Sequence, residues 1–576
     1  MCGVAGILKG NNKSVSFLEL KAMTDVIAHR GPDGEGHWFN NNIGFGHRRL
    51  SIIDLSENAK QPMHYANGRY SITYNGEIYN YLELRAELKT KGFTFKSNSD
   101  TEVLLALFEQ KGYEMLSDLD GMFAFAIWDD HEKTLFCARD RFGEKPFYYA
   151  IKGDEFYFCS EMKGLWAVGV NNEIDTEMAE HYMLTGRVTR NENVSTFYKG
   201  IKQLEAAHYM IVKEGREPLF FRYYEISTEK QESLSDEEAI VRFMEIFTNS
   251  VNLRLRSDVA VGSSLSGGLD SSSIVMLIDK LKNDGVKQNT FSARFKDFDK
   301  DEGEHIHQVV KACKNVIGHE VYPDSNEMQA VFEKIKFHQE EPFASASVFA
   351  QWKVMELAKQ HQVIVLLDGQ GADEYLAGYL PYYRTYFNQL YFTNKKKYKS
   401  ELASYNRLRN NSAVSVEEQE TLRMKIGRVK RTILNQPLPY DSNSLSMELK
   451  SHMQSFGLKE LLRYADRNAM AHSREVRLPF LSHHLVNLVF SMPDHLKLRN
   501  GFTKYILRRS MESILPRSIN WRVDKIGYEP PQNSWLANEF WITKIESGKK
   551  IQKVYFGKNV KQQSDWNYLM TDTFFK

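Results

Sequence analysis

The sequence predicts two domains of different fold class: an α+β domain with stacked sheets, followed by an α/β domain built on a parallel sheet. The chain has 576 residues, which is too many for a single hydrophobic core. Short strand-like runs dominate the first part, whereas strands alternate with helices in the second. A polar, charged stretch separates them, so we expect domains at residues 2–212 and 237–576, joined by a linker at 213–236.

The amino-terminal domain is predicted from short runs of β-type residues bounded by Gly, Asn and Asp turns. The predicted strands lie at residues 43–47, 70–74, 124–128, 135–138, 147–150 and 156–159. Apolar residues at helical spacing predict two helices, at 81–91 and 101–111. Strands interrupted by few helices, without regular alternation of the two, indicate stacked sheets in an α+β domain.

The carboxy-terminal domain begins with a short apolar strand at 259–265, which leads through Ser-Gly-Gly into a helix at 271–281. Further buried strands are predicted at 290–295 and 363–367, with helices between them. From about residue 379 onward the pattern is mostly helical. Alternating strands and helices indicate a parallel sheet, and such a sheet binds its ligands at the carboxyl edge.

Charge and composition exclude several classes of protein. A net charge of +1 gives no overall attraction to nucleic acid or to an anionic membrane, so neither is expected as a partner. The sequence contains no signal-peptide pattern and no apolar run that approaches a membrane span. The four cysteines lie far apart, and Cys137 and Cys159 fall in apolar runs, so we expect reduced core residues. These observations predict a cytoplasmic protein.

Cys2 directly follows the initiator methionine. Removal of Met1 would leave a cysteine that carries a thiol and a free α-amino group on the same carbon. Because an α-amino group titrates near ~8, it can accept the thiol proton at cellular pH, and one residue then supplies both nucleophile and base. The alternative interpretation is that position 2 is small only to permit methionine removal.

The segment at 266–273, Ser-Gly-Gly-Leu-Asp-Ser-Ser-Ser, lies on the predicted strand-to-helix turn. Its glycines let a ligand approach the backbone, and its hydroxyls and free helix amides favour phosphate or pyrophosphate. Asp270 is compatible with such an anion if Mg²⁺ accompanies the phosphates. The segment is not a Walker-type loop, and the alternative interpretation is a turn that merely caps a helix.

A second turn, at 368–374, reads Asp-Gly-Gln-Gly-Ala-Asp-Glu and follows the strand at 363–367. The carboxyl edge of a parallel sheet binds ligands, so these carboxylates are placed to make a second contact with Mg²⁺. The alternative interpretation is a set of solvated acids after a strand.

Four further residues of the amino-terminal domain suggest substrate binding. Asn75 and Gly76 follow an apolar strand and can form an oxyanion hole, although an Asn-Gly hairpin turn is the alternative. Arg49 can hold a substrate carboxylate with two hydrogen bonds. Asp100 can pair with a substrate ammonium or act as a helix N-cap, and the spacing does not choose between these roles.

Taken together, these segments resemble the glutamine-hydrolysing asparagine synthetases over nearly the whole chain. The amino-terminal half is similar to a class II (Ntn-type) glutamine amidotransferase domain, a stacked-sheet sandwich. The remainder is similar to an ATP-pyrophosphatase-type (PP-loop) synthetase domain with added helices. The segments that carry the resemblance are 1–7, 29–33, 49–53, 75–77, 99–100, 266–273, 371–374, 464–473 and 503–508.

The resemblance implies roles for individual residues. Cys2 would be the glutaminase nucleophile, with Asn75 and Gly76 as its oxyanion hole, and Lys525 would neutralise departing pyrophosphate. Glutamine would be bound by Arg49, Leu50, Ser51, Ile52, Ile53, Asn75, Gly76, Glu77 and Asp100. ATP would be bound by Leu265, Ser266, Gly267, Gly268, Asp270, Ser271, Ser272, Ala293, Asp368 and Gly369, and Mg²⁺ by Asp270 and Asp373.

The implied reaction joins two chemistries in one chain. ATP adenylates the carboxylate of aspartate, and ammonia released from glutamine then attacks the acyl-adenylate to give asparagine, AMP and pyrophosphate. Assembly as a homodimer is compatible with the resemblance. A regulatory protein without activity would be expected to lack the nucleophile or the phosphate loop, and this chain retains both.

Three segments depart from the family pattern. Gln370 replaces an acidic residue, Ser482 replaces the aspartate of a Pro-Phe-Leu-Asp stretch, and residues 205–207 read Glu-Ala-Ala where a Pro-Pro-Gly or Pro-Ala-Gly turn is usual. A neutral amide such as Gln370 is a poor base for ammonia. The acceptor therefore has two alternatives, aspartate or another carboxylate such as a sugar acid or a modified amino acid.

Overall fold

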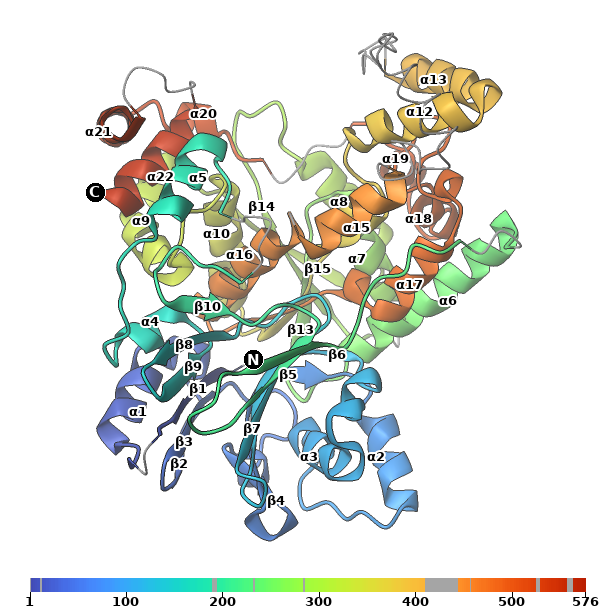
Figure 1. Ribbon diagram of the computed structural model, residues 1–576. Coiled ribbons are helices and arrows are strands. Elements are labelled where there is room, and N and C mark those ends of the chain that lie inside the picture. Colours follow the sequence, from blue (N-terminus) through green and yellow to red (C-terminus); the bar gives the residue numbers. More distant parts are fainter. Residues whose placement is uncertain are drawn as a thin grey trace, which may run out of the picture.

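The computed structural model describes residues 2–10, 13–188, 194–230, 234–282, 285–409, 444–455, 457–524, 529–556 and 563–576. Within them the chain forms two six-stranded sheets and one five-stranded sheet. Figure 1 shows the two six-stranded sheets in the lower half of the view and the five-stranded sheet, with most of the helices, above them. The predicted fold class is confirmed, because an antiparallel two-sheet domain precedes a parallel-sheet domain.

The first sheet is antiparallel and has the strand order β10-β8-β9-β1-β3-β2. Its strands are β1 (Gly3–Leu8), β2 (Gly34–Asn40), β3 (Ile43–Arg49), β8 (Tyr148–Lys152), β9 (Glu155–Cys159) and β10 (Ile201–Gln203). Helix α1 (Phe17–Asp25) begins with a capping box formed by Ser16 and Glu19. It covers the outer face of this sheet, where Leu20 packs in one cluster with Ile7.

The second sheet is also antiparallel, with the order β12-β11-β7-β6-β5-β4. Its strands are β4 (Met63–Tyr65), β5 (Tyr70–Ile78), β6 (Gly121–Asp129), β7 (Thr134–Arg139), β11 (His208–Val212) and β12 (Leu219–Arg222). Helices α2 (Tyr81–Thr90) and α3 (Asp100–Lys111) share an apolar cluster with one face of it. The other face packs on the first sheet, with Val4 and Phe45 in the same cluster as Ala126 and Cys137.

The sequence analysis expects Asn75 and Gly76 after a strand, with a hairpin turn as the alternative, but the structure places both residues inside β5. Asn75, Gly76 and Glu77 lie opposite residues 122–124 of β6. Gly76 is suited to this position because an added Cβ would approach the Met122 carbonyl oxygen to 2.2 Å. The hairpin interpretation is therefore wrong, since the long pairing with β6 overrides the turn preference of Asn-Gly.

The range predicted as a linker, 213–236, contains a strand. β12 pairs with β11 and so belongs to the second sheet. Farther along, the Lys230 ammonium donates to the carbonyl oxygens of Phe490 (3.0 Å) and Met492 (2.9 Å) in the second domain. Helix α6 (Asp236–Arg254) then begins with a capping box formed by Ser235 and Glu238. Most of this polar stretch is thus fixed to one domain or the other.

The third sheet is parallel and has the order β15-β14-β13-β16-β17. Its strands are β13 (Val261–Ser264), β14 (Gln288–Ala293), β15 (Val316–Val321), β16 (Val365–Leu367) and β17 (Glu475–Arg477). The sequence predicts β13, β14 and β16 but not the two edge strands. β15 is half-exposed and β17 is only three residues long, so neither shows the apolar run by which the other three are recognised.

The carboxy-terminal part is mostly helical, as predicted. Its remaining helices are α7 (Leu269–Leu281), α8 (Gly303–Ala312), α9 (Ser325–Gln339), α10 (Ser347–Gln360), α11 (Ala372–Tyr375), α12 (Tyr382–Thr393), α13 (Lys395–Leu408), α15 (Leu445–Gln454), α16 (Leu458–Ala471), α17 (His483–Ser491), α18 (Tyr505–Ser510), α19 (Arg517–Asn520), α20 (Gln532–Trp535), α21 (Glu539–Phe556) and α22 (Asp565–Phe575). α10 packs on β14 and β15, and α16 lies against α9, α10 and β17.

The two domains are joined by more than the covalent connection. Two short helices complete the amino-terminal part, α4 (Met162–Trp166) and α5 (Thr176–Thr185). α5 packs on α22, and Figure 1 shows it among the helices of the carboxy-terminal end. There the Asn567 amide donates to the Tyr182 carbonyl oxygen at 3.2 Å. The domain contact therefore extends well beyond the linker.

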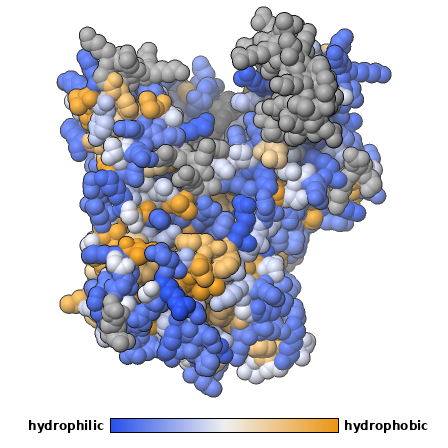
Figure 2. Space-filling model, in the orientation of Figure 1, coloured by the Kyte–Doolittle hydropathy of each residue, from blue (hydrophilic) through white to orange (hydrophobic). Residues whose placement is uncertain are grey.

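Figure 2 shows a mainly hydrophilic surface interrupted by separate apolar patches. The exposed apolar side chains include three consecutive residues of the edge strand β12, Leu219, Phe220 and Phe221. Among the described helices none is both long enough and apolar enough to cross a lipid bilayer. All four cysteines are free, and Cys137 and Cys159 are buried, which confirms their prediction as reduced core residues.

Candidate active sites

A pocket of about 360 Å³ opens beside Cys2, between the ends of β3 and β5 and the start of α3. It brings together most of the residues that the resemblance assigns to glutamine. Its lining consists of Cys2, Arg49, Leu50, Ser51, Ile52, Ile53, Ala59, Gln61, Tyr74, Gly76, Glu77, Ser99, Asp100 and Thr101. Asn75 is fully buried behind this wall and reaches Cys2 through a hydrogen bond.

Cys2 is held at one edge of the pocket. Its backbone nitrogen donates to Asn75 Oδ1 at 2.9 Å, and its Sγ lies 3.9 Å from the Leu50 carbonyl oxygen. Burial raises the pKa of the thiol, so a nearby base is needed to form the thiolate. The Asn75 amide nitrogen is buried and makes no hydrogen bond within the described part of the chain. A buried donor of this kind is suited to an oxyanion that forms only during reaction.

Arg49 and Asp100 are oriented by backbone and side-chain contacts. The Arg49 guanidinium donates to the Ser56 carbonyl oxygen at 3.0 Å and to that of Asp54, which leaves further N–H groups for a ligand. Asp100 accepts from the Tyr74 hydroxyl (2.8 Å) and from a backbone amide of β5. The N-cap of α3 is Ser99, so the N-cap interpretation of Asp100 is wrong.

Glu77 connects this pocket to the second domain. One of its carboxylate oxygens lies 3.6 Å from the Arg477 guanidinium, at the end of β17. Burial, together with the neighbouring Glu475 carboxylate, raises the pKa of Glu77 well above its usual range. A cationic ligand such as an α-ammonium would offset both effects and favour the ionised carboxylate.

We expect Arg49→Met to raise the KM for glutamine by about a hundredfold, because the variant loses a charge-assisted contact to the α-carboxylate. Synthesis from free ammonia should change less than about twofold, since that substrate has no carboxylate. Steady-state kinetics with each nitrogen donor would measure both effects. Equal losses with glutamine and with ammonia would contradict a role in glutamine binding.

The second site lies at the carboxyl edge of the parallel sheet, where β13 leads into α7. Gly267 has φ +75°, and an added Cβ would come within 2.9 Å of His305 Cβ, so glycine is required on both counts. The Ser266 backbone amide donates to the Ser271 hydroxyl oxygen at 3.1 Å, which closes the loop over the first turn of the helix. Gly268 is the N-cap of α7, and Ser272 is fully buried behind it.

The other predicted nucleotide residues lie on neighbouring strands. Ala293 ends β14, and the Ser292 hydroxyl donates to the Leu265 carbonyl oxygen at 2.6 Å. Asp368 and Gly369 follow β16, where an added Cβ on Gly369 would lie 2.9 Å from Asp270 Cβ. The structure therefore brings the two loops, 265–272 and 368–373, side by side at one sheet edge.

Asp270 and Asp373 converge on one cation. The Lys504 ammonium lies 2.5 Å from Asp270 Oδ2 and 2.7 Å from Asp373 Oδ1. Lys504 is almost fully buried, and it is the N-cap of α18. Lys504 lies in the segment 503–508, which carries the family resemblance, but its sequence predicts no role for it, because a single lysine far from both loops carries no spacing signal. Lys525, the predicted pyrophosphate lysine, lies outside the described residues.

Comparison with known proteins agrees with this division into two sites. Residues 1–224 match the model of a glutamine amidotransferase domain, and residues 242–553 match the asparagine synthase model. Asparagine synthetase [glutamine-hydrolyzing] 1 of Bacillus subtilis is 34% identical over 95% of this chain and 90% of its own length. The chain belongs to the asparagine synthase family.

Two further relatives describe the range of this family. Asparagine synthetase [glutamine-hydrolyzing] 3 of Bacillus subtilis is 32% identical over 91% of this chain and 86% of its own length. The amidase chry2 of Gibberella zeae is 27% identical over 98% of this chain and 93% of its own length. The resemblance inferred from the motifs is thus confirmed at the level of the family, and the acceptor substrate is a separate question.

Proposed function

We propose that this chain is a glutamine-dependent asparagine synthetase, which transfers the amide nitrogen of glutamine to aspartate at the expense of ATP. The observation that carries the proposal is the presence in one chain of two separate groups of residues suited to the two half-reactions. One pocket gathers Cys2 with the residues expected to bind glutamine. The other combines a glycine-serine loop with two carboxylates that meet at Lys504.

In the first site Cys2 would act after removal of Met1. Its α-amine takes the thiol proton, and the thiolate attacks the glutamine side-chain carbonyl. Asn75 and the Gly76 amide stabilise the oxyanion, and its collapse expels ammonia with the proton returned by the amine. Water then hydrolyses the thioester to glutamate. Arg49 would hold the α-carboxylate, with Glu77 and Asp100 on the α-ammonium.

In the second site the loop at 266–272 would bind the phosphates of ATP. The acceptor carboxylate attacks the α-phosphorus, and pyrophosphate leaves. Ammonia then attacks the acyl-adenylate, and AMP leaves as the amide forms. Asp270 and Asp373 would hold Mg²⁺, because this ion prefers carboxylate oxygens and both side chains already face one cation. When bound, Mg²⁺ would neutralise charge on the phosphates.

Gln370 favours testing a carboxylate other than aspartate as the acceptor of ammonia. Its side-chain oxygen is buried and makes no hydrogen bond to any described residue, and its backbone amide donates to Asp368 Oδ1 at 3.2 Å. Gln370 directly follows the predicted nucleotide residues Asp368 and Gly369, at a position where the family usually has an acid. We keep another carboxylate, such as a sugar acid or a modified amino acid, as the alternative acceptor.

A cytoplasmic location is part of the same proposal, since Cys2 acts as a free thiol.

The deciding experiment is pyrophosphate release by the processed protein with Mg²⁺, ATP and glutamine, with and without aspartate. We expect aspartate to stimulate release at least about tenfold and asparagine to form in equal amount. The proposal fails for aspartate if glutamine is hydrolysed but neither product depends on aspartate. Release stimulated by a different carboxylate would then identify the alternative acceptor.

A further inference from the structure

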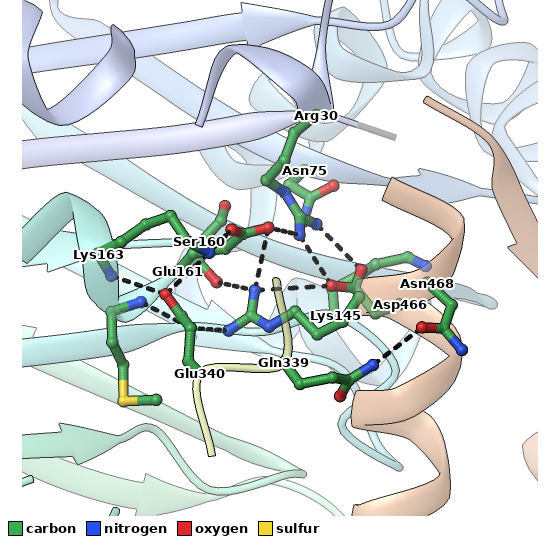
Figure 3. Close-up of polar contacts among 12 residues, drawn as sticks. Arg30, Asn75, Lys145, Ser160, Glu161, Lys163, Gln339, Glu340, Asp466 and Asn468 are labelled. Atoms are coloured by element: carbon green, nitrogen blue, oxygen red, sulfur yellow. Dashed lines mark hydrogen bonds and ion pairs between the residues drawn. The ribbon is translucent and has the colours of Figure 1, made fainter. Parts of the chain in front are cut away.

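A buried cluster of charges lies between the two domains. It consists of Arg30, Glu161, Lys163, Glu340, Asp466 and Arg467, and we call these six residues the interface cluster. The first three come from the amino-terminal domain, and the last three from the end of α9 and from α16. Figure 3 shows Arg30 reaching between Glu161 and Asp466, with Lys163 and Glu340 nearby. Three cations thus face three carboxylates in a buried setting, and Asp466 and Arg467 also line a pocket between the domains.

Arg30 is the member that reaches the glutaminase site. Its Nε donates to the Cys2 carbonyl oxygen at 3.1 Å. The same guanidinium donates to Glu161 Oε1 at 2.7 Å. Arg30 is fully buried, so its side chain is confined to the position that these partners define. The position of the Cys2 main chain therefore depends on how the guanidinium is held.

Asp466 supplies the contact that orients the guanidinium. Its two oxygens accept from two different nitrogens of Arg30, at 2.8 Å and 3.0 Å, so the pair is bidentate. Such a fork fixes the plane of the guanidinium as well as its position. Glu161, in contrast, is shared with His29, Lys163 and Arg467. Asp466 is the carboxylate that uses both of its oxygens on Arg30.

We propose that Asp466 is a positioning residue of the glutaminase, acting through Arg30 on the Cys2 carbonyl. A side chain of the synthetase domain would then hold the nucleophile of the other domain in place. This inference rests on the proposed role of Cys2. The inference includes no contact between Asp466 and glutamine, because the Arg30 guanidinium lies between the Asp466 carboxylate and Cys2.

The kinetic signature follows from this geometry. Asp466 orients the nucleophile, whereas Arg49 and Asp100 line the pocket for the substrate. Loss of the Asp466 charge should therefore lower kcat for glutamine hydrolysis and leave the KM for glutamine within about twofold. A small displacement of a reacting atom costs about tenfold to a hundredfold in rate, and we expect a loss in that range. A merely structural role would not separate kcat from KM in this way.

The test compares Asp466→Asn with a matched control, Glu341→Gln, in the full-length processed protein. Glu341 is also a buried carboxylate of the domain interface, and it accepts from Arg463 of α16 and from the Phe197 backbone amide. It does not touch Arg30. We expect Asp466→Asn to lose at least about tenfold in glutaminase kcat, and the control to stay within about twofold. Equal losses would overturn the proposal, because a general loosening of the interface would then explain both.

Two further measurements keep the test decisive if the variant is less stable. Ammonia-dependent synthesis in the same preparation reports an intact second domain, and the rate of inactivation by the glutamine analogue 6-diazo-5-oxo-L-norleucine reports Cys2 directly. In an Arg30→Met background, Asp466→Asn should cause no further loss of kcat if it acts through Arg30. An additional tenfold loss of kcat would contradict an effect of Asp466 that acts through Arg30.

Failure of this inference can be told apart from failure of the proposed function. If the unmodified protein does not hydrolyse glutamine, the role of Cys2 itself is wrong. If the unmodified protein is active and Asp466→Asn retains full glutaminase kcat, the proposed function stands and the positioning role is wrong.

Discussion

Cys2→Ala should lower glutamine-dependent synthesis by at least about a thousandfold, while synthesis from ammonium salts stays within about twofold of the unmodified protein. The thiol is the only proposed nucleophile in the first pocket, and alanine leaves the binding residues in place. Ammonia enters the reaction after that step and does not need the thiol. Asparagine formation with each nitrogen donor is the measurement.

Cys313→Ala is the matched control for this prediction. Cys313 is a free and partly exposed thiol that follows α8, away from the Cys2 pocket. It should change neither activity. If the Cys2 variant lost the ammonia-dependent reaction as well, the two sites would not be chemically independent, and the assignment of separate roles would have to be abandoned.

Asp270→Asn should have the opposite pattern. We expect ATP-dependent synthesis to fall by about a hundredfold or more with either nitrogen donor, because an amide is a weak ligand for Mg²⁺ and leaves the Lys504 charge less compensated. Basal hydrolysis of glutamine in the absence of ATP should stay within about twofold. Pyrophosphate release and glutamate formation, measured separately, would report the two sites.

Asp279→Asn is a control on the same helix. The Asp279 carboxylate accepts from the Lys314 and Asn315 backbone amides near the far end of α7, so it tests helix stability without touching the loop. Its synthetase activity should stay close to that of the unmodified protein. Unchanged synthesis in Asp270→Asn, in contrast, would remove the basis for a metal role of that carboxylate.

The sequence predicted the elements whose signals are local. The runs at 124–128 and 135–138 correspond to β6 and β7, and the helix expected at 271–281 corresponds to α7 (Leu269–Leu281). Buried strands and amphipathic helices can be recognised from the pattern of residues close together in the sequence. The glycine-serine loop can be recognised in the same way, because its chemically informative residues lie in one short segment. The predictions for these parts therefore needed no tertiary information.

The errors and omissions concern contacts that are distant in sequence. Asn-Gly at 75–76 reads as a turn until β6 is placed beside it. Asp100 reads equally well as a cap, because the contact from Tyr74 that engages its carboxylate lies 26 residues away. The Lys504–Asp270 and Arg30–Asp466 contacts span 234 and 436 residues, and no spacing rule links such positions. The role of a single charged residue can be recognised only when the fold shows which partners lie beside it.

If Asp466 positions Cys2 as proposed, the contact between Arg30 and Asp466 would also set an order of events during synthesis of the chain. Asp466 is translated 436 residues after Arg30, which at about 5–20 residues per second takes about 20–90 s. Throughout that interval Asp466 of α16 has not yet been made, so it cannot accept hydrogen bonds from Arg30. Methionine removal can thus take place on an open terminus, and a ribosome-bound or truncated chain that lacks α16 would hydrolyse little glutamine. The nucleophile would reach its working position only when the domain that consumes the ammonia has been made.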